Sequence, residues 1–348
     1  MNIVYYKFFE RENIMKKRLK MLSLGLAAVF TVSLCACGEK NSDTVRVNLN
    51  EVVHSIFYAP QYVALEKGMF DEEGLDVVLS VGQGADKSMT ALISGDADIA
   101  LLGTEAGIYV YNEGREDYAM AFAQLTQRAG NFLVARTDEP FDWEDVRGKE
   151  IIGGRTGGMP QLVLEYILKE KGIIPGTDTE IINNISFTST AGAFAAGTGD
   201  YTVEFEPTAT SLEQSGGGYI VASLGTESGY VPYTVYMAQK SFIESNPEVV
   251  QKFTNAIYKG QLWVNSHTAR EIAEVVLPYF EESDIDTLET IIERYKAQDT
   301  WKTDPVFDTK GFELIQDIME TGGELTKRVP FDKFIDTSFA EKAVKSVK

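Results

Sequence analysis

The sequence predicts an α/β fold, and three observations lead to this prediction. From residue 45 onward, short apolar runs typical of strands alternate with amphipathic helical patterns. The alternation restarts near residue 132, and beyond residue 238 the pattern becomes almost wholly helical. Strands that are separated by helices pair in parallel through right-handed crossovers, so we expect sheets that helices cover on both faces.

The first half of the chain carries three strand patterns, each followed by a helical one. The strand patterns lie at residues 45–50, 76–81 and 98–102, and the helical patterns lie at 60–67, at 86–94 and from 104 onward. Gly68 and Gly95 stand where the first two helices would end, because glycine readily adopts the left-handed backbone of a helix C-terminus. Asp86 and Thr104 are suitable N-terminal caps for the helices that follow them.

The second half repeats this alternation before it becomes helical. Strand patterns occur at 132–136, 150–153, 181–187, 201–205 and 233–238, with helical patterns at 160–171, at 190–196 and after Pro207. Beyond them lie a helix at 247–265, a capping box at 268–271, and helical patterns around 285–295 and 312–319. We expect these last helices to pack against the earlier sheets, and we predict no chemistry for them.

Residues 15–37 have the features of a secretory signal peptide. A basic cluster precedes a short apolar run at 22–36, which ends at a small residue before a cysteine. The run is shorter than the ~20 residues that span a bilayer. Residues 34–37, Leu-Cys-Ala-Cys, resemble the lipobox of bacterial lipoproteins, which implies cleavage before Cys37 and lipidation of Cys37. An ordinary signal peptide is the alternative interpretation.

The segments on either side of this signal carry little information. Residues 1–14 lack signal features, so Met15 is a candidate start of translation, and 1–14 are then not translated. Residues 38–44 are short and polar, and we predict that they form a tether between the anchor and the fold.

Cysteine content and charge narrow the function. The only two cysteines, Cys35 and Cys37, lie in the leader, so the rest of the chain has no disulfide, thiolate nucleophile or cysteine metal site. Without residues 1–37 the chain has 26 basic and 50 acidic residues, a net charge near −24. Such a surface repels phosphate backbones and anionic headgroups, so we expect no nucleic-acid partner and assign membrane attachment to the lipid.

An ordered set of motifs resembles the periplasmic-type solute-binding proteins of the nitrate/sulfonate/taurine and thiamine-precursor pyrimidine group. The longest is Tyr-Ala-Pro-Gln-Tyr-Val-Ala-Leu-Glu-Lys-Gly-Met-Phe-Asp-Glu-Glu-Gly-Leu-Asp at 58–76. The others are Gly-Gln-Gly-Ala at 82–85, Leu-Ile-Ser-Gly-Asp-Ala-Asp-Ile at 92–99, Arg-Gly-Lys-Glu-Ile-Ile-Gly-Gly at 147–154, Phe-Glu-Pro at 205–207 and Phe-Ile-Glu-Ser-Asn-Pro-Glu at 242–248. The resemblance spans about 45–263, in the family's order.

The resemblance implies the two-lobe periplasmic-binding-protein fold of type II, with a ligand in the cleft between the lobes. Two crossing hinge strands would lie near 132–136 and 233–238. The first lobe would then comprise 45–131 plus 239–348, and the second lobe 132–238. Such a protein would be lipid-anchored outside the bacterial cytoplasm and deliver a small molecule to the permease and ATPase of an ABC importer. We expect a monomer without a cofactor.

The strongest ligand-binding candidate is the loop Gly-Gly-Arg-Thr-Gly-Gly-Met-Pro at 153–160. It follows a strand and opens a helix, where ligands of open α/β sheets bind. Unpaired N–H groups at a helix start favour an anion, and the Arg155 side chain can add a bidentate contact. From this loop we select Arg155, Thr156, Gly157, Gly158 and Met159. A tight turn with a solvated Arg155 is the alternative.

Acidic and aromatic residues supply further candidates. Glu204 and Glu206 are two residues apart, so on one strand they share a face and one of them can receive an amine or a protonated ring nitrogen. Phe57, Tyr58, Tyr230 and Tyr233 can form flat walls for a heterocycle. The remaining candidates lie in loops of the first lobe: Asn50, His54, Gly84, Thr104, Glu105, Gln127, Arg128 and Asn131.

Enzymatic function is the main alternative to binding. Enzymes related to this fold include a thiamine pyrimidine synthase that uses a cysteine-rich motif, which the chain lacks after residue 37. The only histidines, His54 and His267, are distant in the sequence and no cysteine follows residue 37, so we predict no zinc site and assign no metal ligands. Carboxylates alone could still hold calcium or magnesium. We therefore predict a binding protein and not an enzyme. A sensor that works without a transporter is a third possibility.

The ligand is the least determined feature. The Arg155 loop favours an anion such as a sulfonate, whereas the aromatic and acidic candidates favour a nitrogen heterocycle such as a thiamine-precursor pyrimidine. We favour the pyrimidine type.

Overall fold

The computed structural model describes residues 44–347. The predicted signal peptide, the predicted lipidation site at Cys37 and residues 38–43 of the predicted tether lie outside the described residues. Among residues 44–347, none of the helices combines the length and hydrophobicity that a membrane span requires.

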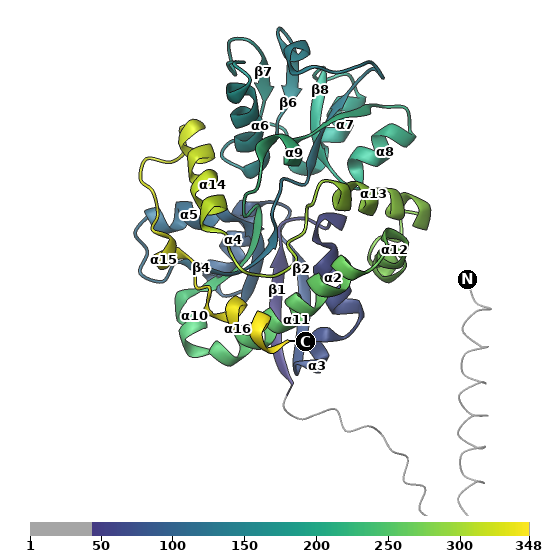
Figure 1. Cartoon of the computed structure of the whole chain (residues 1–348). Coiled ribbons are helices and arrows are strands. Elements are labelled where there is room, and N and C mark those ends of the chain that lie inside the picture. The colour runs from purple at the N-terminus through teal and green to yellow at the C-terminus, as the bar shows by residue number, and fades with distance from the viewer. Residues whose placement is uncertain (1–43, 348) are drawn as a thin grey trace, which may run out of the picture. The chain divides into compact units, whose positions relative to one another are not determined.

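Two lobes are each built around a five-stranded sheet, which confirms the predicted α/β fold (Figure 1). The first sheet contains β1 (Val45–Glu51), β2 (Leu75–Val81), β3 (Ile99–Gly103), β4 (Ala119–Thr126) and β10 (Thr234–Gln239), in the order β2-β1-β3-β10-β4. The second contains β5 (Asn131–Ala135), β6 (Glu150–Ile152), β7 (Glu180–Ile182), β8 (Tyr201–Phe205) and β9 (Tyr219–Ser223), in the order β7-β6-β8-β5-β9.

The two sheets share one topological feature. In the first, β1 is parallel to β2 and β3, and β10 runs antiparallel between β3 and β4. In the second, β6 is parallel to β7 and β8, and β5 runs antiparallel between β8 and β9. The strand by which the chain crosses into the second lobe, β5, and the strand by which it returns to the first, β10, are therefore the reversed strands of their sheets.

The lobe boundaries differ in one place from the expected ones. We expected 132–238 to form the second lobe, but β10 pairs with β3 and β4 of the first sheet. The chain passes between the sheets at 127–130 and again at 229–233, so the second lobe ends before β10 begins.

Helices pack on the faces of both sheets. The first lobe has η1 (Ile56–Tyr58), α2 (Ala59–Glu66), α3 (Met69–Glu72), α4 (Ala85–Ser94) and α5 (Thr104–Asn112). The second has η2 (Trp143–Val146), α6 (Met159–Glu170), η3 (Phe187–Ser189), α7 (Thr190–Ala195), α8 (Thr208–Gln214) and α9 (Leu224–Ser228). The chain ends in α10 (Lys240–Ser245), α11 (Pro247–Ser266), α12 (Ala269–Val276), η4 (Leu277–Tyr279), α13 (Ile285–Ala297), α14 (Thr309–Thr321), α15 (Phe331–Phe334) and α16 (Ser338–Ser346).

Local sequence signals explain several of these boundaries. Gly95 ends α4 with a left-handed φ of 82°, as its position in the sequence predicts. Thr268 and Glu271 form the predicted capping box at the start of α12. The strand predicted at 181–187 is shorter than expected, because β7 ends at Ile182 and Phe187 begins a 3-10 helix. Strands β4 and β9 were not predicted.

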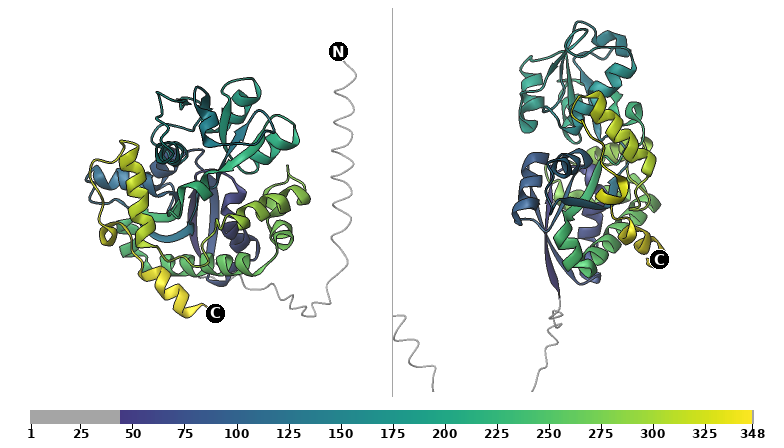
Figure 2. Two further views of the ribbon diagram at one scale, coloured as in Figure 1. Left: turned by 45° about the horizontal axis from the view of Figure 1, so that its top comes forward. Right: turned by 90° about the vertical axis from the view of Figure 1, so that its left-hand side faces the viewer.

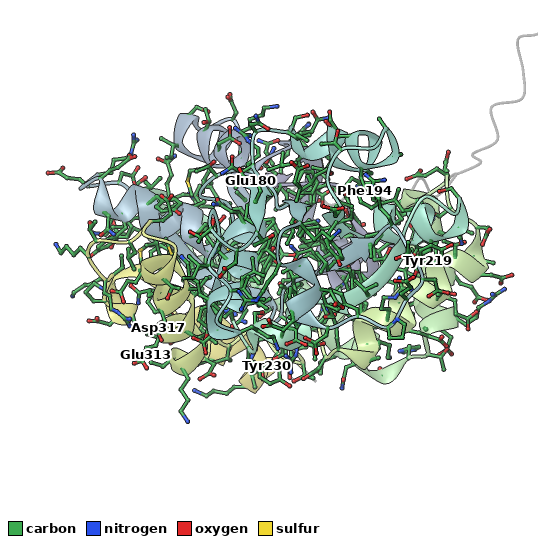
Figure 3. All side chains as sticks on the ribbon, turned by 90° about the horizontal axis from the view of Figure 1, so that it is seen from above. Glu180, Phe194, Tyr219, Tyr230, Glu313 and Asp317 are labelled. Carbon is green, nitrogen blue, oxygen red and sulfur yellow. The ribbon has the colours of Figure 1, made fainter. Side chains whose placement is uncertain are left out.

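Two C-terminal helices, α13 and α14, connect the lobes (Figures 1 and 2). Helix α14 packs between α5 of the first lobe and α6 of the second, and the Lys169 ammonium of α6 donates to the Thr321 carbonyl at 2.6 Å. Glu313 and Asp317 of α14 point outward into solvent (Figure 3), whereas Phe312 and Ile315 face the core. The C-terminal helices thus bridge the two lobes.

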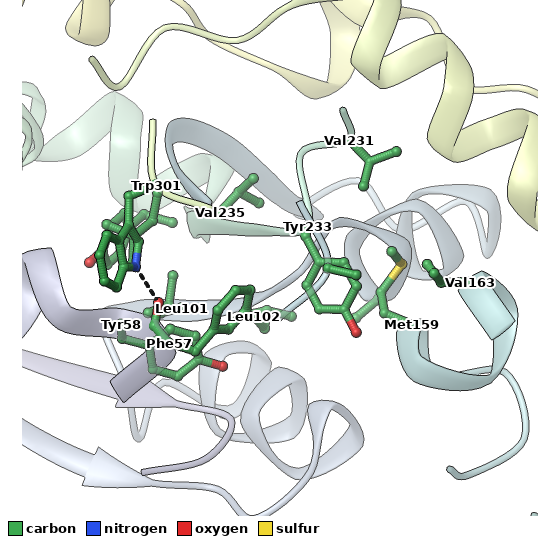
Figure 4. Close-up of a cluster of buried hydrophobic side chains, with 14 of the residues drawn as sticks. Phe57, Tyr58, Leu101, Leu102, Met159, Val163, Val231, Tyr233, Val235 and Trp301 are labelled. Atoms are coloured by element: carbon green, nitrogen blue, oxygen red, sulfur yellow. Dashed lines mark hydrogen bonds between the residues drawn. The ribbon is translucent and has the colours of Figure 1, made fainter. Parts of the chain in front are cut away.

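An aromatic core fills the hinge between the lobes (Figure 4). Phe57 is fully buried, and the Trp301 indole N–H donates to its carbonyl at 2.9 Å. The Tyr295 hydroxyl of α13 donates to the carbonyl of Gly130 in the first crossing at 2.8 Å. A Cβ atom at Gly130 would lie 2.2 Å from the Phe57 ring, so only glycine allows this close approach.

On the second-lobe side of this core, Arg294 of α13 binds a buried carboxylate. Its guanidinium donates to Glu206, which is fully buried, and to Glu213 at 2.9 Å. Glu206 also accepts from the Thr210 backbone N–H at 2.9 Å. Burial raises the pKa of Glu206, although the positive charge of Arg294 lowers it.

We predict that Arg294→Met lowers the free energy of unfolding by about 3 kcal/mol, because it leaves the Glu206 carboxylate buried without its cation. Urea denaturation at neutral pH measures the change. Arg270 also contacts several carboxylates, Glu274, Asp286 and Glu289, but it lies at the surface. The control Arg270→Met should therefore change stability by less than about 1 kcal/mol. Equal effects of the two substitutions would contradict this account.

Candidate functional site

A cavity of about 760 Å³ lies between the two lobes. Its first-lobe wall consists of residues that follow β1, β2 and β3, one face of α5 along its length, the start of β10 and two residues after α14. Its second-lobe wall consists of the loop between β6 and α6, η3 and the end of β8. The carboxyl ends of the parallel strands of both sheets therefore face this space, as expected for open α/β sheets.

Nine of the residues selected from the sequence line the cavity: Tyr58, Gly84, Glu105, Arg155, Thr156, Gly157, Gly158, Met159 and Tyr233. Eight of them follow or flank the carboxyl ends of parallel strands, or open the next helix. Tyr233 precedes β10, and because β10 is antiparallel to β3 its first residues lie at the same sheet edge.

The glycine-rich loop from 153 to 158 brings the start of α6 to the cavity. Gly154 and Gly157 have φ values of 95° and 75°, which only glycine adopts without strain. Gly158 is the N-cap of α6 and provides no side-chain cap, and because Gly158, Met159 and Pro160 line the cavity, the start of the helix borders this space.

Two contacts join the lobes at the mouth of the cavity. The Arg155 guanidinium of the second lobe donates to the Asp86 carboxylate of the first lobe at 3.1 Å. The Tyr109 hydroxyl of α5 donates to the Gly157 carbonyl at 2.9 Å. Arg155 and Asp86 are both more than half exposed, so their ion pair is weak.

Glu105 is the acidic side chain in the interior of the cavity. It is 2 % exposed, and its Oε2 atom has no hydrogen-bond partner among the described residues. Burial raises its pKa to about 7, although the backbone N–H groups of Glu105, Met159 and Ala106 hold it lower than burial alone would. Met159 belongs to α6, so Glu105 of the first lobe faces the helix start of the second.

Two tyrosines lie beside this carboxylate. Tyr58 is 2 % exposed and Tyr233 is also 2 % exposed, and the Tyr233 hydroxyl has no partner among the described residues. Burial, and next the negative charge of Glu105, raise the pKa of Tyr233 well above its usual value. Both hydroxyls are therefore neutral groups that can donate to or accept from a ligand.

Several lining residues were missed in the sequence. The apolar surface is formed by Val52, Val53, Met89, Ala106 and Val110, and further aromatic surface by Phe187 and Phe205. Phe205 lies between the two glutamates that the strand pattern singled out, so strand alternation contained a usable signal. Glu324 and Thr326 follow α14, in a segment for which we predicted no chemistry, and nothing local identifies them.

The expected pair of strand carboxylates does not line the cavity. Glu204 accepts hydrogen bonds from Thr202 at 2.7 Å and Thr190 at 3.1 Å, and burial raises its pKa to about 7. Glu206 lies after the end of β8, where it binds Arg294. The two therefore share no face toward a ligand, and Glu105 is the acidic group in the cavity interior.

Four first-lobe candidates lie outside the cavity because they hold its supporting structure. Phe57 belongs to the hinge core, and Thr104 donates to the Pro232 carbonyl. The Asn50 amide donates to Ser80 at 3.0 Å. His54 contacts the buried Glu51 carboxylate at 3.0 Å and the Tyr279 carbonyl at 2.6 Å.

Four hinge candidates also do not line the cavity. Gln127 donates to the Asp299 carbonyl at 3.1 Å, and Tyr230 donates to the Asp299 carboxylate at 2.8 Å. Arg128 donates to the Gly225 carbonyl and lies over the Tyr230 ring. Asn131 is fully buried at the start of β5. Gln127, Arg128 and Tyr230 therefore join the crossings of the chain to neighbouring segments, whereas neither polar side-chain atom of Asn131 has a partner among the described residues.

Within residues 44–347, no group of three or more histidine, cysteine, aspartate and glutamate side chains is arranged to hold a metal ion.

Comparison with known proteins gives the family. A model of the NMT1-like family matches residues 44–277. YtlA of Bacillus subtilis (strain 168), which is named a candidate binding protein, is 48% identical over 328 residues, covering 93% of this chain and 98% of that protein. A 4-amino-5-hydroxymethyl-2-methylpyrimidine phosphate synthase of Aspergillus parasiticus is 25% identical over 246 residues, covering 63% of this chain and 66% of that protein.

A solved structure agrees with the fold. The alkanesulfonate-binding protein SsuA from Xanthomonas axonopodis pv. citri, bound to MOPS, superposes with a TM-score of 0.67 at 14% identity. The superposition covers 85% of this chain and 100% of that one. The predicted two-lobe periplasmic-binding-protein fold is thus confirmed.

The buried Glu105 predicts a specific pH dependence of stability. Because its folded pKa lies above its usual value, the folded state binds a proton between about pH 4.5 and 7 that the unfolded state does not. Stability from this group is therefore lost as the pH rises through that window. Relative to Glu105→Gln, the wild type should lose about 2 to 3 kcal/mol between pH 5 and pH 8.

Urea denaturation at both pH values measures this loss. Glu113→Gln changes an exposed carboxylate at the cavity mouth, and its stability should run parallel to that of the wild type. A Glu105→Gln variant that also runs parallel to the wild type would contradict the raised pKa.

Proposed function

The chain belongs to the NMT1-like family, and on this premise we propose that it is an extracytoplasmic solute-binding lipoprotein of an ABC import system. It captures a small metabolite between its lobes and delivers it to a permease and its ATPase. The observation that carries this proposal is the cavity of about 760 Å³ whose walls come from both lobes. A ligand there contacts two bodies joined by two crossings, so binding and closure are one event.

The distribution of contacts around the cavity supports hinge closure. On the hinge side, buried Tyr295 and Trp301 bind the Gly130 and Phe57 carbonyls. At the mouth, the lobes meet through the Arg155–Asp86 pair and a single tyrosine hydroxyl. The hinge is therefore held by buried hydrogen bonds, whereas the exposed Arg155–Asp86 pair contributes little to holding the mouth closed.

The proposed ligand is a thiamine-precursor pyrimidine-like heterocycle or a sulfonate- or taurine-like anion. The aromatic walls and Glu105 favour the first class. The start of α6 and Arg155 favour the second. The protein acts as a monomer, held at the bacterial membrane by lipid on Cys37. A ligand sensor without a transporter is the alternative use of the same binding event.

A pyrimidine-synthase-like enzyme is a second candidate function, which the similarity to the fungal synthase favours. The chain lacks cysteine after residue 37, so the cysteine-rich motif of such enzymes has no counterpart here. Capture of a ligand and its release unchanged therefore remains the proposal.

A thermal-shift panel of pyrimidines, sulfonates, flavins and amino acids tests this function. A bound compound at a hundred times its dissociation constant should stabilise the protein by roughly 2.7 kcal/mol. Mass spectrometry of the recovered compound should show it unchanged. A chemically converted compound would support the enzyme, and the absence of any shift across the panel would count against solute binding.

We predict that Arg155→Asp opens the mouth, because the new carboxylate repels Asp86, and that adding Asp86→Arg closes it again. An exposed pair of this kind changes the opening free energy by about 1 kcal/mol. Spin labels on cysteines at Glu116 and Thr177, with Cys35 and Cys37 replaced, report the distance between the lobes. If the double variant stays as open as Arg155→Asp, the ion pair plays no part in closure.

A further inference from the structure

Glu105 differs from the other buried carboxylates. Four are buried in the described part of the chain: Glu51, Glu105, Glu204 and Glu206. Glu51 accepts from Gln61, Tyr62 and His54, and the two β8-side carboxylates accept from threonines or Arg294. Among these four described carboxylates, only Glu105 keeps an oxygen, Oε2, without a partner. An unpaired buried acceptor is energetically unfavourable unless a ligand supplies a donor.

The position of Glu105 also bears on the charge of the ligand. It occupies the first turn of α5, and the N–H of Met159, at the first position of α6, approaches its carboxylate. Two helix N-termini are therefore directed at a carboxyl group that the protein itself supplies, and above about pH 7 this group is negatively charged. An anionic ligand at the same place would meet the Glu105 carboxylate instead of unpaired N–H groups.

The charges of the cavity wall favour the same conclusion. Four acidic residues line it: Asp86, Glu105, Glu113 and Glu324. Arg155 is the single basic residue among the described lining residues, and it is already paired with Asp86. A sulfonate or nitrate would enter this cavity against a net negative charge, whereas a cation or a neutral donor would not.

The remaining wall suits a flat or apolar body with a polar edge. Tyr58, Phe187, Phe205 and Tyr233 supply aromatic surface, and the unpaired Tyr233 hydroxyl lies on the same side as Glu105. A nitrogen that donates to Oε2 would satisfy the carboxylate and place its ring against these side chains.

We infer that Glu105 is the specificity-determining residue of the cavity, which accepts a hydrogen bond from a donor nitrogen of the ligand and excludes oxyanions. The inference rests on the proposed function and deepens it, because it decides between the two ligand classes. The ligand is a nitrogen base or amine with a planar or apolar body.

Calorimetric titration with two matched probes tests the inference. The first probe is 4-amino-5-hydroxymethyl-2-methylpyrimidine, and the second replaces its 4-amino group with methyl, which removes the donor. The first probe should bind at least tenfold more tightly than the second to the wild type. Glu105→Gln should weaken the first probe at least tenfold and leave the second within twofold, so that the two losses are not additive. Ethanesulfonate and nitrate should not bind.

Glu204→Gln is the matched control, because Glu204 is a buried carboxylate with its pKa raised to the same value, about 7, but it does not line the cavity. It should leave the affinity of both probes within twofold. Unfolding midpoints of both variants establish that they are folded before their affinities are compared.

The outcomes separate this inference from the proposed function. Equal affinity of wild type and Glu105→Gln for the amino probe, or equal loss in Glu204→Gln, would overturn the role of Glu105 and leave solute binding intact. Binding of ethanesulfonate or nitrate, or of neither pyrimidine, would overturn the ligand class. The proposed function itself falls only if the entire metabolite panel also fails to stabilise the protein.

Discussion

The chain passes between the lobes twice, and each passage delivers the reversed strand that its new sheet contains. This constraint places the site. Because β10 runs against β3, the residue that precedes it, Tyr233, lies at the edge where the parallel strands end. The crossings also bring Gly130 against Phe57, where no other residue would fit. The hinge and the rear of the cavity are therefore one packed structure.

The buried carboxylates have two different roles: some stabilise the fold, and one lies at the proposed binding site. Glu206 is bound by Arg294 and Thr210, and Glu51 by Tyr62 and Gln61, so these charges join segments distant in sequence. Glu105 has the same burial but an unpaired oxygen at the interlobe cavity. An unfavourable group is retained in a folded protein when the rest of the fold compensates for it, and such groups concentrate at functional sites.

Much of the architecture could be predicted from local pattern. Most elements could be located to within a few residues from three signals: glycines after helices, the capping box of Thr268, and the alternation of strands with helices. Strand β4 was missed because its alanine-rich apolar run has no distinct period, and a short apolar run does not separate strand from helix. The loop with Arg155 was correctly located at the cavity. Its predicted preference for an anion is opposed by Glu105, which approaches the start of α6 from the other lobe.

The sequence by itself determined the α/β class, the two-lobe family and the strand ends from which the cavity is built, because these depend on periodicity and on the residues that end helices and strands. Only the tertiary structure decided which polar groups face the ligand. Glu204 and Glu105 are both acidic residues at strand ends, yet Thr190 and Thr202 satisfy one and nothing satisfies Oε2 of the other within residues 44–347. The partners of a buried polar group come from segments distant in the chain, so local pattern cannot reveal whether they exist.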